Sequence, residues 1–292
     1  YSTAVQAVGG TLGIIIPPSI VFVIYGSTNG VSISKLLMSG MLPGILTAVV
    51  LCVYGYVVAK KENFPKSFDQ FSLGRVFKSL KGAIWALMMP LIILGGIYGG
   101  IFTPTESAMI ACAYGLIVSF FVTKELTVRN FMDVVSKTAA STANVTVMFL
   151  AAQVFGFLIA YYDITTTIAN FFVAVSPNWI IFMGLVFILL TITGMFMEVG
   201  ATNVILSPLL APVAAAFGID PIHFGMVFVF LLALGQATPP FGSTMFIACG
   251  ISGERVAAVI RRLLPFVLVE YACALVFAYV PWFSIFLPNL MS

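Results

Sequence analysis

The chain has 292 residues, of which 61% are hydrophobic and 8% are charged. Soluble domains carry about 25% charged residues, so this composition excludes a soluble fold. The long runs of Leu, Ile, Phe and Val do not alternate with polar residues, which excludes a transmembrane β-barrel. We therefore predict an all-α polytopic membrane protein in the lipid bilayer, in which each span needs about 20 apolar residues.

The charged and metal-binding residue types narrow the function further. The formal net charge of +3 is small and gives no reason to expect a nucleic-acid partner. The four cysteines are scattered singly and His223 is the only histidine, so we expect no transition-metal site and no organic cofactor. Because the sequence has no cluster of His, Cys or acidic residues, we do not expect an enzyme.

Residues 1–35 are predicted to form a first re-entrant helical hairpin. The apolar stretch 2–12 is followed by Ile-Pro-Pro-Ser at 16–19, and apolar sequence resumes at 20–25. Proline lacks an N–H group and breaks a helix interior, and each arm is too short to cross a membrane. An ordinary span with a proline kink is the alternative.

Residues 36–137 contain spans at 36–59 and 83–100 and a third that begins near Thr103. Thr103, Pro104 and Glu106 have the pattern of a helix start, so a capping carboxylate is favoured over an ion ligand at Glu106. Positive charges favour cytoplasmic connections. Those of the first connection are Lys60, Lys61, Lys66, Arg75, Lys78 and Lys81. Those of the second are Lys124, Arg129 and Lys137.

Residues 138–292 contain two more irregular stretches in apolar sequence. We predict a broken helix at 194–203, which holds two glycines, a carboxylate and an amide. We predict a second re-entrant hairpin at 224–251, broken by Gly-Gln-Ala-Thr-Pro-Pro-Phe-Gly-Ser at 235–243. His223 follows a helix-capping pattern and is predicted to be structural. A final span occupies 263–280, and the connection at 163–178, which has no Lys or Arg, is expected outside.

The two proline breaks belong to an internal repeat. A shift of 222 residues places Pro17 and Pro18 on Pro239 and Pro240, and the same shift places Pro43 on Pro265. The span after the first break ends at a basic cluster, whereas the span after the second begins with basic residues at 255–262. The two units are therefore predicted to be inverted, as in secondary transporters that bind their ligands where broken helices meet.

The same shift leaves residues 138–235 with almost no counterpart, since twelve residues precede Gly13. We expect the counterpart to lie before Tyr1, in an N-terminal part absent from this chain.

The breaks expose groups that suit a cation and a carboxylate. Unwound turns leave carbonyl oxygens free, and with hydroxyls these suit Na⁺. Helix N-termini carry partial positive charge and suit an anion. The predicted sodium-binding residues are Gly13, Ile16, Pro17, Ser19, Gly194, Met197, Gly200, Asn203, Thr238, Pro239 and Gly242. The predicted substrate-binding residues are Ser19, Glu198, Thr202 and Ser243.

Glu198 has two open roles. As a proton or cation carrier it would make coupling pH-sensitive; as a structural residue it would accept hydrogen bonds from exposed N–H groups. No Lys or Arg occurs between Lys137 and Arg255. An anionic substrate would therefore depend on helix dipoles, hydroxyls, bound Na⁺ or parts of the protein outside this chain.

Five motifs in order resemble the large membrane (M) subunit, DctM-like, of tripartite ATP-independent periplasmic (TRAP) transporters. They are Leu-Gly-Ile-Ile-Ile-Pro-Pro-Ser at 12–19, Gly-Met-Leu-Pro-Gly at 40–44, Gly-Ile-Phe-Thr-Pro-Thr-Glu at 100–106, Gly-Ile-Asp-Pro-Ile-His-Phe-Gly at 218–225 and Thr-Pro-Pro-Phe-Gly at 238–242. The resemblance covers essentially the whole chain. It departs at the N-terminus, because the family's large subunit is longer.

The resemblance implies Na⁺-coupled symport of a carboxylate-bearing solute, such as a C4-dicarboxylate or sialic acid, across the bacterial inner membrane. It implies two partners, a small membrane (Q-type) subunit and a periplasmic substrate-binding protein. It also implies an elevator mechanism, in which a transport domain carrying both hairpins moves against a scaffold; residues 36–137 would supply scaffold and part of the transport domain. The alternatives are an ion-coupled elevator transporter of anions without a binding protein, a channel and a membrane enzyme.

Overall fold

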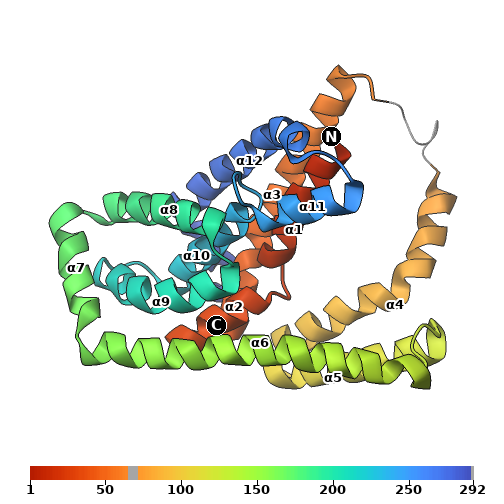
Figure 1. Ribbon diagram of the computed structural model, residues 1–292, viewed down its shortest axis with the longest axis horizontal. Helices are drawn as coiled ribbons and strands as arrows, with labels where there is room; N and C mark the ends of the chain where they lie inside the picture. The colour runs from red at the N-terminus through yellow and green to blue at the C-terminus, as the bar shows by residue number, and fades with distance from the viewer. Residues whose placement is uncertain (65–71, 291–292) are drawn as a thin grey trace. The chain divides into compact units, whose positions relative to one another are not determined.

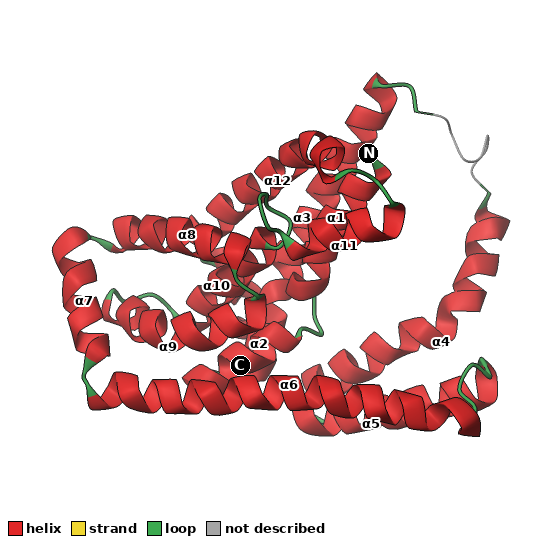
Figure 2. Cartoon of the chain, viewed as in Figure 1, coloured by secondary structure: helices red, strands yellow, loops and turns green. Residues whose placement is uncertain are grey.

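The computed structural model describes residues 1–64 and 72–290, so Lys66 of the first basic connection lies outside the described residues. Throughout this part of the chain, helices are joined by turns and loops (Figure 2). The helices are α1 (Ser2–Ile15), α2 (Ile20–Asn29), α3 (Ile33–Lys61), α4 (Leu73–Tyr98), α5 (Pro104–Ile117), the π-helix η1 (Val118–Val122), α6 (Val128–Tyr161), α7 (Ile164–Val175), α8 (Trp179–Phe196), α9 (Val199–Ala216), α10 (Pro221–Gly235), α11 (Ser243–Ser252), α12 (Val256–Tyr279) and α13 (Trp282–Asn289).

Six segments of the described chain are long and apolar enough to cross a membrane, or seven if the bent pair α12–α13 counts as one span. This confirms the predicted polytopic α-helical class. The chain divides into two compact units, one made of Tyr1–Val57 and Val147–Ser292 and the other of Val58–Thr146. The first unit contains both proline breaks.

The first proline break lies between α1 and α2, as predicted, but the chain does not fold back there. Residues 16–19 are non-helical, and Figure 1 shows α2 extending beyond α1 instead of returning alongside it. The two helices together form one apolar segment of 28 residues, long enough to span a membrane. The broken span, which was the alternative to a hairpin, therefore describes residues 2–29.

The second break lies between α10 and α11 and repeats the pattern of the first. Residues 236–242 are non-helical, and α11 leads on from α10 in Figure 1. Helices α2 and α11 each have 10 residues. The next helices, α3 and α12, carry Pro43 and Pro265 in their interiors. The 222-residue repeat is thus a repeat of helix, break, helix and proline-containing helix.

A reversal of chain direction occurs instead between α8 and α9. Met197 and Glu198, both extended, separate the two helices, and Figure 1 shows α9 returning along the direction from which α8 came. The prediction of a break within 194–203 is confirmed, but its geometry differs: this break forms the hairpin. Helices α8 and α9 have 18 residues each. Because two extended residues separate them, they can pack on each other.

Helix α10 forms the centre of the first unit. Every residue from His223 to Gly235 is buried, and a helix that is apolar on all sides belongs in a core. It packs against α1, α2, α8, α9, α12 and α13. The His223 ring contacts Ser284 Oγ at 2.7 Å and the Ala278 carbonyl at 3.2 Å, so this histidine is structural, as predicted.

The second unit contains α4, α5 and η1. Helix α5 begins with the predicted capping box: the Thr103 N–H donates to the Glu106 carboxylate (2.8 Å), and the Glu106 N–H donates to the Thr103 hydroxyl (3.3 Å). Tyr114 of α5 donates to the Trp85 carbonyl of α4 at 2.8 Å. Glu106 therefore has the structural role that the sequence favoured.

Candidate ion and substrate site

Ser19 is the N-cap of α2 and lies at the end of the first break. Its backbone is extended, and its side chain makes no capping hydrogen bond. The hydroxyl is buried, yet among the described residues it has no hydrogen-bond partner. Buried hydroxyls are normally hydrogen-bonded. Ser19 therefore presents an oxygen and an uncapped helix N-terminus that a ligand can use.

Asn203 of α9 lies against the same break. Its side-chain Nδ2 donates to the Val21 carbonyl in the first turn of α2 at 2.9 Å. Its Oδ1 is buried and has no hydrogen-bond partner in the described chain. Two buried oxygens without partners, one from Ser19 and one from Asn203, thus belong to one region, and oxygen atoms are the ligands that hard cations prefer.

Helix α3 approaches the first break through two glycines. A Cβ atom on Gly40 would lie 2.6 Å from the Ile15 carbonyl oxygen, and one on Gly44 would lie 2.5 Å from Ile16 Cγ1. The absence of side chains lets α3 approach the end of α1 closely. Ile16 and Pro17 are partly and fully buried there, while Gly13 is exposed in the last turn of α1.

Gln236 makes most of the side-chain hydrogen bonds at the second break. It was not among the site residues predicted from the sequence. Its Nε2 donates to the carbonyls of Gly194 (3.2 Å) and Met197 (3.1 Å) at the end of α8. Its Oε1 accepts a hydrogen bond from Ser243 at the start of α11. Its backbone carbonyl accepts from both the N–H (3.0 Å) and the hydroxyl (2.7 Å) of Thr244. The signal in the sequence is an amide beside the Thr-Pro-Pro break.

Thr238 and its neighbours complete the second break. The Thr238 hydroxyl donates to the Leu234 carbonyl at 2.7 Å and lies 3.1 Å from the Tyr271 hydroxyl of α12. Pro239 is partly buried and Gly242 is buried. A Cβ atom on Gly242 would lie 2.5 Å from the Gln236 carbonyl oxygen, so the loop closes tightly on itself.

The segment 194–203 contributes to both breaks instead of completing one site. Gly194 and Met197 meet Gln236 at the second break, whereas Asn203 meets Val21 at the first. Thr202 is buried, and its hydroxyl donates to the Glu198 carbonyl at 2.9 Å. Gly200 is buried in the first turn of α9.

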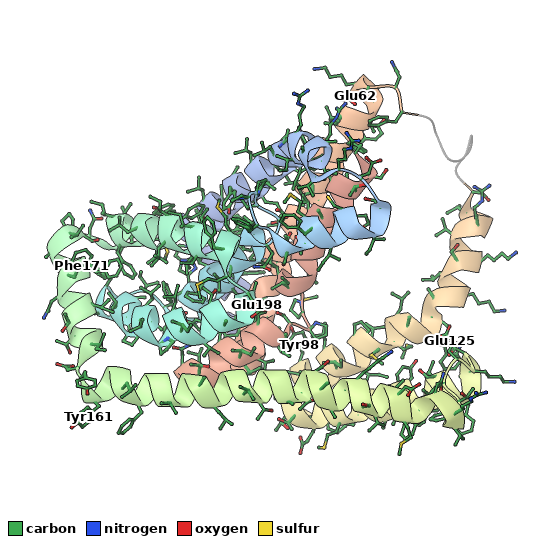
Figure 3. The ribbon with its side chains drawn as sticks, viewed as in Figure 1. Glu62, Tyr98, Glu125, Tyr161, Phe171 and Glu198 are labelled. Carbon is green, nitrogen blue, oxygen red and sulfur yellow. The ribbon has the colours of Figure 1, made fainter. Side chains whose placement is uncertain are left out.

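Glu198 is exposed, contrary to its appearance in the sequence as a carboxylate inside an apolar run (Figure 3). It is the N-cap of α9, and its carboxylate accepts a hydrogen bond from the Ala201 N–H at 2.9 Å. A carboxylate is favourable at a helix N-terminus. This contact supports the structural alternative for Glu198.

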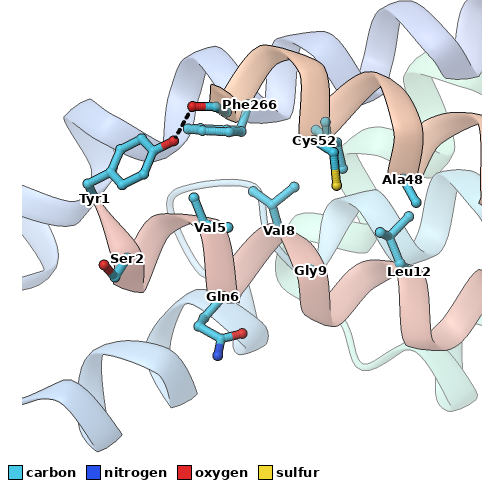
Figure 4. Close-up of a pocket in the computed structure, with 12 residues that line it drawn as sticks. Tyr1, Ser2, Val5, Gln6, Val8, Gly9, Leu12, Ala48, Cys52 and Phe266 are labelled. Carbon is cyan, nitrogen blue, oxygen red and sulfur yellow. Dashed lines mark hydrogen bonds between the residues drawn. The ribbon is translucent and has the colours of Figure 1, made fainter. Parts of the chain in front are cut away.

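An apolar groove of about 560 Å³ runs along α1 and α3, and Figure 4 shows its lining. The Tyr1 hydroxyl closes one end by donating to the Gly55 carbonyl at 2.7 Å. None of the predicted site residues lines this groove. In the described residues, no group of three or more His, Cys, Asp or Glu side chains could hold a metal ion.

Apolar helices interrupted at two related breaks, with buried polar side chains beside each, place the chain in the class of polytopic membrane proteins with broken helices. The sequence model of the family described as tripartite ATP-independent periplasmic transporter, DctM component, matches residues 1–283. The chain belongs to this family, and it is therefore a protein of the bacterial inner membrane.

Three relatives show the extent of the match. The isethionate TRAP transporter permease protein DctMQ of Oleidesulfovibrio alaskensis is 39% identical over 98% of this chain and 45% of the relative. The C4-dicarboxylate TRAP transporter large permease protein DctM of Pseudomonas aeruginosa is 34% identical over 99% and 67%. The sialic acid TRAP transporter large permease protein SiaM of Vibrio cholerae is 33% identical over 99% and 68%. The chain thus spans about half of the first relative and about two thirds of the other two. All three are named as permeases, which agrees with the expectation that the chain is not an enzyme.

Proposed function

We propose that the chain forms the core of the large membrane subunit of a TRAP transporter that imports a carboxylate-bearing organic solute together with Na⁺. The observation that carries this proposal is the pair of buried oxygens at the first break, Ser19 Oγ and Asn203 Oδ1, which lack protein partners in the described chain. A Na⁺ ion there would supply the missing partner for both. Oxygen ligands at an unwound helix are the arrangement by which broken-helix transporters hold coupling ions.

The solute would bind near the same break. The uncapped N-terminus of α2 offers partial positive charge to a carboxylate, and a bound Na⁺ adds to it. This matters because the sequence has no Lys or Arg between Lys137 and Arg255. The names of the relatives include isethionate, C4-dicarboxylate and sialic acid, all of them organic anions.

The assembly and the motion belong to the same proposal. The chain would work with a small membrane subunit, separate or fused, and with a periplasmic binding protein that delivers the solute. The first compact unit, which carries both breaks, would move as the transport domain of an elevator. The DctMQ name of one relative supports a subunit that is sometimes fused.

Uptake into proteoliposomes tests the proposal. The complete transporter is reconstituted with and without Na⁺ and with and without its purified binding protein, and uptake should require both. Uptake that needs Na⁺ but not the binding protein would instead support the elevator transporter of anions that works alone. Uptake that needs neither would refute the proposal.

Two variants separate the ion site from general damage. Asn203→Ala should raise the Na⁺ concentration needed for half-maximal uptake at least tenfold, because it removes a buried oxygen ligand. Ser27→Ala, on the exposed face of α2, should leave it unchanged. If both variants need the same Na⁺ concentration for half-maximal uptake, Asn203 is not a ligand of the ion.

A further inference from the structure

Glu270 lies in the interior of α12 and is not among the residues of the two breaks. It is the only acidic residue of that helix and is fully buried. One carboxyl oxygen, Oε2, has no hydrogen-bond partner in the described chain. Ionisable side chains inside a membrane protein are costly and usually have a function.

Glu270 contacts α1 through the hydroxyl of Thr11. Thr11 Oγ1 is 2.6 Å from Glu270 Oε1 and also 2.6 Å from the Val8 carbonyl oxygen. Both distances are those of O–H···O hydrogen bonds. A threonine hydroxyl has a single proton, and a carbonyl oxygen can only accept. Thr11 could share its proton between the two acceptors, but two linear bonds form when Thr11 donates to Val8 and Glu270, as a neutral acid, donates to Thr11.

Among the described residues, no Lys or Arg side chain is hydrogen-bonded to the Glu270 carboxyl, whose one hydrogen-bond partner is Thr11. Helices α1 and α8 have no titratable side chain, α11 has only Cys249, and α10 has only His223, whose ring is bonded to Ser284 and Ala278. The titratable side chains beside Glu270 on α12 are those of Tyr271 and Cys273, neither of which carries a positive charge. Arg261 and Arg262 lie about two helical turns earlier on α12. An ionised Glu270 would therefore be a buried charge without a cationic partner, which is strongly unfavourable.

We propose that Glu270 and Thr11 form a proton-binding site, separate from the sites at the breaks, that is occupied whenever α1 packs against α12. Release of the proton leaves a carboxylate that needs water or a cation, so it loosens the contact between these helices. The contact is complete at low pH and weakens as the pH rises and the carboxyl ionises. The site takes up one proton from water and needs no other reactant. It does not depend on the proposed function.

Infrared spectroscopy tests the occupancy of the site. The full protein is purified in ester-free detergent, and the C=O stretching band of protonated carboxyl groups is compared between variants at neutral pH. Glu270→Gln should remove a band that Glu254→Gln, an exposed control, retains. Thr11→Val should shift that band, because the acid loses its acceptor. An unchanged spectrum in Glu270→Gln would overturn the proposal. A carboxyl band that appears only when Na⁺ is withdrawn would also overturn it, because the site would then hold Na⁺ and not a proton.

Hydrogen exchange tests the coupling to α1. With exchange rates corrected for the intrinsic effect of pH, protection of α1 should fall as the pH rises in the natural protein. In Glu270→Gln, which cannot ionise, protection should stay constant. Protection of α1 that does not change with pH in either protein would refute the coupling.

Discussion

Gln236 connects three segments of the chain through one side-chain amide. Its two donors satisfy carbonyls at the end of α8, and its acceptor is taken by Ser243 of α11. A buried acceptor that loses its donor is destabilising by about 1–3 kcal/mol, because it has already given up water. The amide therefore keeps the second break and the end of α8 in one arrangement.

Replacement of Gln236 by Ala should lower the free energy of unfolding by about 1–3 kcal/mol, since the Gly194 and Met197 carbonyls lose their donor. Thermal unfolding in detergent measures this as a lower melting temperature. The matched control is Gln6→Ala, because Gln6 is exposed on α1. If the two variants melt at the same temperature, the bridge contributes nothing to stability.

The residues at the breaks differ in how far their surroundings could be predicted from the sequence. Ser19 and Asn203 could be named as candidate ligands because each is a polar residue at a predicted break in apolar sequence. The exposure of Glu198 could not be predicted, because it depends on where the turn between α8 and α9 lies in the folded unit. Thr11 and Glu270 are 259 positions apart, and their contact follows only from the packing of α1 on α12.

Helices α8 and α10 cross at a pair of glycines, which is a feature of packing between elements. A Cβ atom on Gly235 would lie 2.5 Å from both Cα and the carbonyl carbon of Gly194. These are backbone atoms, so no change of rotamer could relieve the clash. The close approach brings the Gly194 carbonyl within reach of Gln236.

Gly235→Ala should therefore lower the free energy of unfolding by about 1–3 kcal/mol, as overpacking of a core does. Gly250→Ala is the control: Gly250 lies in α11 with open space around it, and alanine there should raise the free energy of unfolding by about 0.5–1 kcal/mol. Melting curves of the two variants should thus shift in opposite directions. A melting temperature of Gly235→Ala that is unchanged or higher would show that the crossing tolerates a methyl group.

The position of each helix break could be predicted, but the path of the chain through it could not. Proline and glycine determine locally that 16–19 and 236–242 are not helical. Whether the next helix continues or returns depends on the surfaces it can bury. Helices α2 and α11 pack on α9 and on α1, elements far away in sequence, so both continue beyond their breaks.

At the scale of the whole molecule, the inverted repeat predicts which side of the membrane each connection faces. The basic connection after α3 should be cytoplasmic, and the connection between α6 and α8 should be outside. In a protein without its four native cysteines, Asp163→Cys should react with a membrane-impermeant maleimide in spheroplasts, where the outer face of the inner membrane is accessible. Ser72→Cys should react only after permeabilisation. The opposite pattern would reverse the orientation, and labelling of both from outside would refute the predicted sidedness of these two connections.

The turn formed by Met197 and Glu198 lies between the two breaks. Gly194 and Met197 accept hydrogen bonds from Gln236 at the second break. Asn203, later in the same segment, donates a hydrogen bond to Val21 at the first break. A ligand that tightens one break therefore changes the free energy of the other through a few covalently linked residues. Thermodynamic linkage makes this effect mutual, so each ligand changes the affinity of the other by the same factor. A ligand at the first break and a ligand at the second would then bind cooperatively even if they never touched each other.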